Sequence, residues 1–204
     1  GEWRRKSYVG VIADICSGFE ISIKVVQGQR QTWHVVTSRI SAVNPGQMAR
    51  EAAFLKRHTT RQVKVALPSP YLLGERMWDE ELSRDAYPTR RDFTEALVPV
   101  LRNELAALRD EGVAVAQFDD PSICLFVDPT VRARYEDPDG EIDYAVDLLN
   151  RTVAGIEGID LALHLCRRNK GRSGWVGEGG YGPILPALSE LAFDSLMFEF
   201  AMPA

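Results

Sequence analysis

A histidine and a cysteine two positions apart, His164-Leu165-Cys166, are the residues of this sequence whose types and spacing most directly suggest chemistry. Side chains at i and i+2 of a strand point to the same face, so an imidazole and a thiolate can reach one metal ion. Glu199 lies near the end of the next apolar run and can add a carboxylate oxygen. Zinc accepts these three ligand types and keeps an open position for substrate in catalytic sites. The alternative is a core histidine beside a buried thiol.

Two adjacent carboxylates, Asp119 and Asp120, follow a run of residues at 113–118 that is nearly all apolar. Carboxylates are costly to bury unless they bind a cation, a hydrogen-bond donor or a substrate amine. The alternative is that Asp120 caps a helix, or that Asp120-Pro121 forms a turn. Cys124 lies in the loop that follows and can approach a metal, but for Cys124 and Cys16 we favour small buried apolar side chains.

A basic segment follows Cys166 and continues into glycines. Its charged members are Arg167, Arg168, Lys170 and Arg172, and its glycines are Gly174, Gly177, Gly179 and Gly180. Such a segment can bind an anionic group or close over a site, because arginine pairs with carboxylate or phosphate and glycine tolerates large backbone changes. The alternative is a solvated loop. The glycine spacing does not match a dinucleotide-binding fingerprint.

These residues need strands to position them, and four short apolar runs meet that need. The runs are 63–67, 113–118, 161–165 and 196–200, and stretches of helical period separate them. This alternation predicts βα units and a parallel sheet. The polar residues fall at or just past the carboxyl ends of these runs, where the active sites of parallel barrels lie.

The intervening segments predict helices. The stripe of Phe93, Leu97, Leu101, Leu105 and Leu108 predicts one helix, which Gly112 ends and Pro99 can kink. Further helices are expected at 141–155 and from about Pro183 to Leu191. Nearer the start, 20–26 and 31–37 predict a hairpin, and 47–58 predicts a helix whose Ala49, Ala52, Ala53 and Leu55 face the core.

Repeated βα units indicate an α/β fold, specifically a (β/α)8 TIM-type barrel formed by a single domain over 1–204. A complete barrel takes roughly 250 residues. With 204 residues, the chain is expected to lack the first and last βα units. The alternative is a smaller open α/β sheet.

The composition argues against several classes of partner. A formal net charge of -5 argues against a surface dedicated to nucleic acid or anionic membranes. No apolar run reaches the roughly 18 to 20 residues that span a bilayer. Three widely spaced cysteines do not form a secreted disulfide framework. We therefore expect a cytoplasmic protein that binds small molecules.

Several motifs, taken in order, resemble the catalytic barrel of the cobalamin-independent methionine synthase family and its short single-domain bacterial relatives. Gln117-Phe118-Asp119-Asp120-Pro121 resembles the family's Q-x-D-E-P, and His164-Leu165-Cys166 resembles its zinc-binding H-x-C. The segments Cys166-Arg167-Arg168-Asn169, Gly179-Gly180-Tyr181 and Phe198-Glu199-Phe200 are similar to C-R-G-N, G-G-Y and L-E-Y, and Gly1-Glu2 with Arg4 and Arg5 is similar to G-E-x-x-R.

The resemblance implies a zinc-dependent methyltransferase. His164, Cys166 and Glu199 would bind zinc, while Glu2 and Asp119 would hold the amino group of homocysteine or a similar thiol. The methyl donor would be methyltetrahydrofolate or another carrier, and a homo-oligomer is possible. Zinc would bind the substrate thiol as a thiolate, which attacks the methyl group.

Four features depart from the family pattern. The family's further zinc-binding cysteine on a later strand is missing from these 204 residues, as is its N-terminal barrel strand. Asp120 stands for the usual Glu and Arg168 for the usual Gly.

The competing functions are an epoxyalkane:coenzyme M transferase, a zinc-free enzyme of the uroporphyrinogen decarboxylase type, and a non-catalytic barrel subunit.

Overall fold

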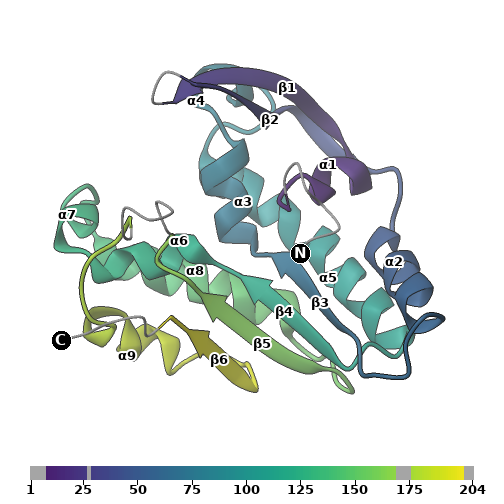
Figure 1. Ribbon diagram of the computed structural model, residues 1–204. Helices are drawn as coiled ribbons and strands as arrows, with labels where there is room; N and C mark the ends of the chain where they lie inside the picture. The colour runs from purple at the N-terminus through teal and green to yellow at the C-terminus, as the bar shows by residue number, and fades with distance from the viewer. Residues whose placement is uncertain (1–7, 27–28, 169–175, 200–204) are drawn as a thin grey trace.

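The computed structural model describes residues 8–26, 29–168 and 176–199. It contains a four-stranded parallel sheet, a two-stranded antiparallel hairpin and helices that pack on both (Figure 1). In chain order the elements are α1 (Val11–Ile15), β1 (Cys16–Val26), β2 (Gln29–Ala42), α2 (Gln47–Lys56), β3 (Lys64–Pro68), α3 (Pro70–Met77), α4 (Glu80–Ser83), α5 (Arg90–Asp110), β4 (Val115–Asp119), α6 (Pro121–Cys124), η1 (Leu125–Val127), α7 (Pro129–Arg132), α8 (Pro138–Val153), β5 (Asp160–Leu165), η3 (Gly182–Ile184), α9 (Leu185–Leu188) and β6 (Ser195–Phe198).

The four predicted strands are confirmed, with ends shifted by one or two residues. They pair in parallel in the order β3-β4-β5-β6, so neighbours in the sheet are also neighbours in the chain. Leu67 pairs with Phe118, and Phe118 pairs with Leu163. The register brings the carboxyl ends of all four strands to one edge of the sheet.

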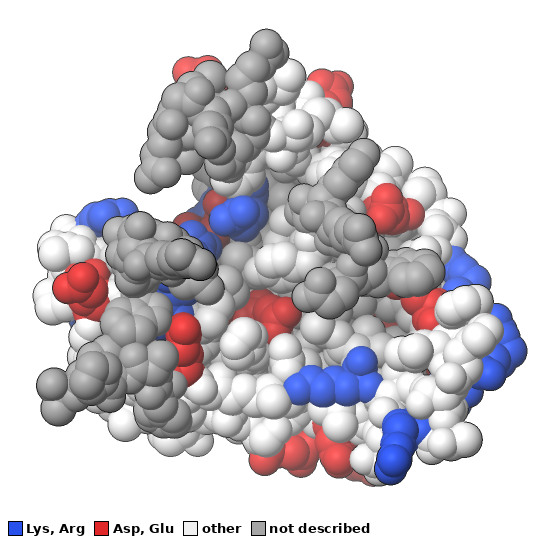
Figure 2. Space-filling model, in the orientation of Figure 1, with Lys and Arg blue, Asp and Glu red and all other residues white. Residues whose placement is uncertain are grey.

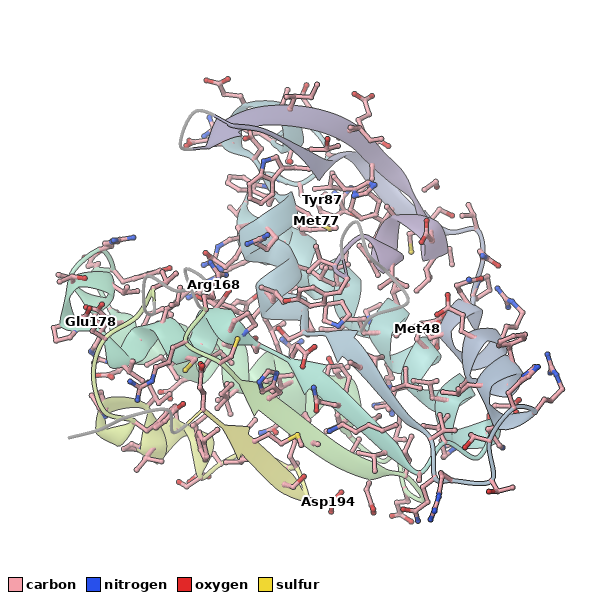
Figure 3. All side chains as sticks on the ribbon, viewed as in Figure 1. Met48, Met77, Tyr87, Arg168, Glu178 and Asp194 are labelled. Carbon is pink, nitrogen blue, oxygen red and sulfur yellow. The ribbon has the colours of Figure 1, made fainter. Side chains whose placement is uncertain are left out.

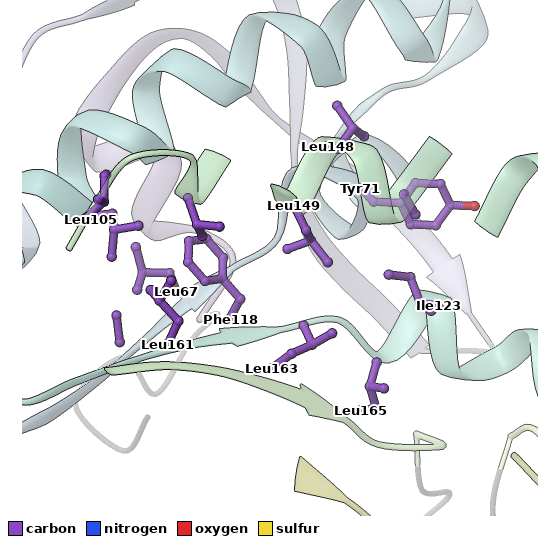
Figure 4. Packing of buried hydrophobic residues seen from close by; sticks show 14 of the residues in the cluster. Leu67, Tyr71, Leu105, Phe118, Ile123, Leu148, Leu149, Leu161, Leu163 and Leu165 are labelled. Atoms are coloured by element: carbon purple, nitrogen blue, oxygen red, sulfur yellow. The ribbon is translucent and has the colours of Figure 1, made fainter. Parts of the chain in front are cut away.

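One face of the sheet carries the main hydrophobic core. Phe118, Leu163 and Leu67 are fully buried there, and they pack with Leu105 of α5 and Leu149 of α8 (Figure 4). The two long helices α5 and α8 cover this face (Figure 1). Burying a large apolar side chain contributes about 1.5–3 kcal/mol, so this layer holds the strand ends in place.

The structure confirms the two long helices that the sequence predicted. α5 begins in a capping box formed by Thr89 and Asp92, includes Pro99 and is followed by Gly112, whose φ of 75° is in the left-handed region. α8 starts three residues earlier than expected, where Asp137 caps it. The helix expected from Pro183 to Leu191 is instead the short pair η3 and α9.

The predicted hairpin is present and longer than expected. A bulge between Ser17 and Phe19 shifts its register, and Gly18 there has a φ of 104°. A second core cluster, including Leu73, Phe93 and Tyr87, joins the hairpin to α3 and α5. Figure 3 shows Tyr87 and Met77, the last residue of α3, on the side of α3 that faces the hairpin. The Tyr87 hydroxyl accepts a hydrogen bond from the Ile40 N–H at 3.0 Å.

Two expectations need correction. The parallel α/β character of the predicted barrel is confirmed, but the described residues form an open sheet with β3 and β6 at its edges, not a closed (β/α)8 barrel. In α2, Ala52 is buried and Ala49 packs against the core as expected, but Leu55 is 46% exposed and Met48 is the buried residue beside Ala52. Across the described ranges, none of the helices is long and apolar enough to cross a membrane.

Candidate active site

The carboxyl edge of the parallel sheet gathers the polar residues that the sequence singled out. Asp119 is the last residue of β4 and pairs with His164 of β5, which in turn pairs with Met197 of β6. Cys166 and Glu199 each come directly after these strands. The structure therefore places Asp119, His164, Cys166 and Glu199 at the ends of three neighbouring strands.

His164 is held by a carboxylate. Its Nδ1 lies 3.1 Å from Asp119 Oδ1, and the Gln117 amide donates to the same oxygen at 2.6 Å. The His164 and Asp119 side chains are 38% and 18% exposed, so both remain open to a ligand. A carboxylate bonded to one ring nitrogen orients the imidazole and leaves the other nitrogen, Nε2, to bind a metal or substrate.

Cys166 and Glu199 are electrostatic neighbours. Burial raises the pKa of the Cys166 thiol, and the carboxylates of Glu199 and Asp119 raise it further, which outweighs the hydrogen bond from the Arg168 backbone and the positive charge of Arg168. Glu199 Oε2 accepts a hydrogen bond from the Arg167 N–H at 3.0 Å, and the Tyr181 hydroxyl bonds to the Glu199 backbone. A thiolate at this position therefore needs a nearby cation to stabilise it.

The chemistry of these side chains fits zinc, because imidazole nitrogen, thiolate sulfur and carboxylate oxygen are its usual ligands. The carboxylate on His164 Nδ1 is also the usual support for a zinc-bound histidine. Within the described ranges, however, no three His, Cys, Asp or Glu side chains lie close enough together to hold a metal ion. The donor types fit the metal, while the side chains are not drawn together around a common point.

Asp120 has a structural position. Its side chain is fully buried, and Oδ1 accepts hydrogen bonds from the N–H groups of Ser122 and Ile123, both at 3.0 Å, so it caps α6. The Ser69 hydroxyl donates to its other oxygen, Oδ2. Burial raises the pKa of Asp120 to about 6, although all three bonds favour the carboxylate. Of the alternatives left open for this residue, the helix cap agrees with these contacts.

The two other cysteines are buried. Cys16 and Cys124 are 1% and 0% exposed, as expected for small apolar side chains. Burial raises the pKa of Cys16 to about 11 and that of Cys124 to about 12. Cys124 is near Cys166 and Glu199 in electrostatic terms, yet it interacts with Tyr181 through its side chain. Glu2, Lys170 and Arg172 lie outside the described residues.

The sequence analysis missed residues that the fold brings to this edge from further away. Arg76 of α3 stacks over the ring of Trp33 from the hairpin, with 4.7 Å between guanidinium carbon and ring centroid. Tyr8 lies within electrostatic range of Asp119, Arg76 and Cys166. The one signal in the sequence was Arg76 itself, a charged residue between the buried Leu73 and Met77 on a helix that follows a strand end.

Comparison with known proteins gives consistent matches. Residues 26–201 match the family described as cobalamin-independent synthase, catalytic domain. A methionine synthase of Sulfolobus acidocaldarius is 28% identical over 199 residues, which cover 96% of this chain and 50% of that protein. The chain thus spans about half the length of this curated relative.

Solved structures show the same fold. A B12-independent methionine synthase from a Shewanella species, in complex with selenomethionine, has a TM-score of 0.74 at 22% identity, covering 96% of this chain and 55% of that one. A protein described as a possible vitamin B12-independent methionine synthase from Listeria monocytogenes has a TM-score of 0.65 at 20% identity, covering 96% of this chain and 54% of that one. At these identities the likeness concerns the fold alone.

Proposed function

This chain belongs to the cobalamin-independent methionine synthase family, and on that premise we propose that it transfers a methyl group to the thiol of homocysteine or a similar small thiol, with zinc as cofactor. The observation that carries the proposal is the placement of His164, Cys166 and Glu199 at adjoining strand ends, with Asp119 bonded to the histidine. Methyltetrahydrofolate or another carrier would donate the methyl group.

In this proposal His164 Nε2, Cys166 Sγ and Glu199 hold the zinc ion. The bound ion would lower the pKa of the substrate thiol, so that a thiolate is available at neutral pH. It would also supply the positive charge that the raised pKa of Cys166 calls for. Three ligands from the chain leave a position open, which suits a site that must accept a substrate sulfur.

Asp119 has two tasks in the proposed reaction. Its Oδ1 holds the His164 ring and accepts from Gln117. Its Oδ2 can then accept a hydrogen bond from the ammonium group of a thiol amino acid. A single carboxylate would in this way orient a metal ligand and position the substrate, so the thiol and the metal are brought together in a fixed geometry. Glu2 is proposed as the second group on the amine.

The experiment is a measurement of zinc content by elemental analysis, in protein purified without chelator. We expect near-stoichiometric zinc in the wild type and its loss in Cys166→Ser. The matched control is Cys16→Ser, which removes a buried thiol away from the strand ends and should keep its zinc. Zinc absent from the wild type, or retained by Cys166→Ser, would contradict the proposed site. Methyl transfer to homocysteine in the zinc-bearing wild type then tests the reaction.

A further inference from the structure

The segment Gly179-Gly180-Tyr181, which is similar to a motif of the family's short members, has no part in the proposed reaction so far. It lies close to η1 and α7, and Figure 3 shows Glu178 beside α7. The Glu178 N–H donates to Asp128 Oδ2 at 3.1 Å. Gly179 has a φ of 136°, and a Cβ there would overlap the Val127 carbonyl oxygen, so this position needs glycine. The close packing on η1 therefore holds the tyrosine of this segment in a fixed place.

The Tyr181 hydroxyl bonds to both backbone groups of a single residue, Glu199. It accepts a hydrogen bond from the Glu199 N–H at 3.0 Å and donates one to the Glu199 carbonyl oxygen at 2.9 Å. The ladder between β5 and β6 ends one residue earlier, at the pair Leu165 and Phe198. The hydroxyl therefore takes the place of a neighbouring strand for the first residue past β6.

The Tyr181 side chain is itself held firmly. The residue is 9% exposed, and its ring packs edge-on against Phe198 with 4.6 Å between the ring centroids. The guanidinium carbon of Arg167, another buried residue, lies 4.9 Å from the centroid of the tyrosine ring. The buried Cys124 thiol interacts with the same hydroxyl. Glu199 is thus held by a side chain that has little freedom to move.

The carboxylate of Glu199 is held from a second direction. Its Oε2 accepts a hydrogen bond from the Arg167 N–H at 3.0 Å, and Arg167 directly follows Cys166. Figure 2 shows a hollow between the hairpin and the sheet on this face, and the His164 and Asp119 side chains at the strand ends are partly exposed, so a ligand can reach this edge. With its backbone fixed, Glu199 needs only side-chain rotations to contact that ligand, which lowers the conformational entropy lost on binding.

We propose that Tyr181 is a positioning residue that acts through Glu199, because its hydroxyl fixes the backbone from which this carboxylate reaches the metal. The proposal rests on the proposed function, in which Glu199 is one of three zinc ligands. Groups that support a metal ligand typically contribute tenfold to a hundredfold to metal affinity. A tyrosine that only packs its segment against Phe198 would need its ring and not its hydroxyl, so the two roles differ in one atom.

The test removes the hydroxyl and keeps the ring, in Tyr181→Phe. In the metal-free full chain we expect amide hydrogen exchange at Glu199, followed by NMR, to become about tenfold faster, because its N–H loses its acceptor. The amides of Ser122 and Ile123, which bond to Asp120, should exchange as in the wild type. Unchanged exchange at Glu199, or equal acceleration at all three amides, would overturn the proposal.

Metal binding gives the second measurement. We expect Tyr181→Phe to weaken zinc binding about tenfold in competition with a chelating dye. It should also change the visible bands of the Co²⁺-loaded protein, because these bands depend on coordination geometry. The control is Tyr144→Phe, which removes a hydroxyl bonded to Thr94 and Glu95 in the helical layer and should change neither property.

The outcomes separate this proposal from the proposed function. Zinc affinity and Co²⁺ bands that are the same in wild type and Tyr181→Phe overturn the positioning role and leave the proposed function standing. Zinc binding that depends on the hydroxyl, without methyl transfer to homocysteine, supports the positioning role and removes the proposed reaction. A wild type that binds neither metal overturns the zinc site and with it a role for Tyr181 in metal binding.

Discussion

The helical layer, formed by α5 and α8, and the carboxyl edge of the parallel sheet use charged residues in opposite ways. In the helical layer Glu141 receives two arginines, Arg90 and Arg91, and Arg90 also pairs with Glu75 at 2.8 Å. At the sheet edge Asp119 bonds to His164, and Cys166 and Glu199 follow the neighbouring strand ends, while Arg76 and Arg168 form no ion pair with a described residue. Paired charges stabilise a fold, whereas charges left without partners are what a ligand-binding site offers.

This difference predicts that the largest loss of stability comes from a substitution in the helical layer, Glu141→Gln. The Glu141 side chain is 8% exposed and that of Arg90 is 21% exposed, so Glu141→Gln leaves Arg90 short of a partner in a poorly solvated position, while Arg91 is 55% exposed. We expect the free energy of unfolding to fall by about 3 kcal/mol, near the low end for a broken buried pair, because Glu75 still holds Arg90. Urea unfolding measures this loss.

The matched control for Glu141→Gln is Asp110→Asn. It breaks the pair with Arg109, in which the Asp110 side chain is 67% exposed, and should cost less than about 0.5 kcal/mol. Equal losses in the two variants would show that the helical layer does not depend on its ion pairs.

The contributions of Glu141 and Asp120 to the free energy of unfolding should depend on pH with opposite signs. Burial opposes ionisation of Glu141, but hydrogen bonds from Arg90 and Arg91 outweigh it and lower its pKa below the ordinary 4.5. Its contribution to stability is therefore present above that pH and is lost as the pH falls through the lowered pKa. Asp120 behaves in the reverse way. Its contribution to stability is complete below pH 3.8, the ordinary pKa of an aspartate, and is lost as the pH rises through its raised pKa of about 6.

Measuring the free energy of unfolding between about pH 3 and 8 checks both signs. A difference of about two pKa units for Asp120 corresponds to at most about 3 kcal/mol. We expect Glu141→Gln to flatten the acid side of the curve and Asp120→Asn to flatten the loss between about pH 4 and 7. A curve with the same shape in wild type and Asp120→Asn would mean that the native carboxylate is not destabilised.

Within the site, Asp120 should be the residue that stabilises the fold. Asp120→Ala removes the cap of α6 and leaves the buried Ser69 hydroxyl without its acceptor, so we expect a loss of about 2 kcal/mol at neutral pH. Asp119→Asn, one residue away, keeps an oxygen at a position that is only partly buried and should cost less than about 1 kcal/mol. Thermal unfolding of both variants tests the comparison, and a larger loss for Asp119→Asn would reverse our interpretation of the pair.

The sequence predicted the elements whose evidence is local. The strands from Lys64–Pro68 to Ser195–Phe198 and the helix of Phe93 and Leu108 follow from apolar runs and periodicity, and the structure confirms them. The full length of the hairpin was not predicted, because the bulge at Gly18 interrupts its alternation of polar and apolar residues. Of the predicted barrel, expected to lack its first and last βα units, the structure confirms the parallel α/β sheet; the described residues form an open sheet, and strand closure depends on partners that local periodicity does not specify.

The candidate site was predictable only along the strands. His164, Cys166 and Asp119 stand at strand ends, so their proximity followed from the βα pattern. Arg76 comes from a helix and is held by a hairpin residue, and no spacing in the sequence links these to the strand ends. The role of Asp120 stayed open because an aspartate before proline suits both a helix cap and a ligand site. Burial and three hydrogen bonds supplied the missing information.

The smallest expected effect concerns the backbone at Arg168. Arg168→Gly and Arg168→Ala both remove the guanidinium group and its bond to Ser122, but only glycine takes up a φ of 50° without strain. We expect the glycine variant to be more stable than the alanine variant by about 1 kcal/mol, the approximate cost of a left-handed backbone. If alanine were as stable as glycine, the backbone at this position would not be strained.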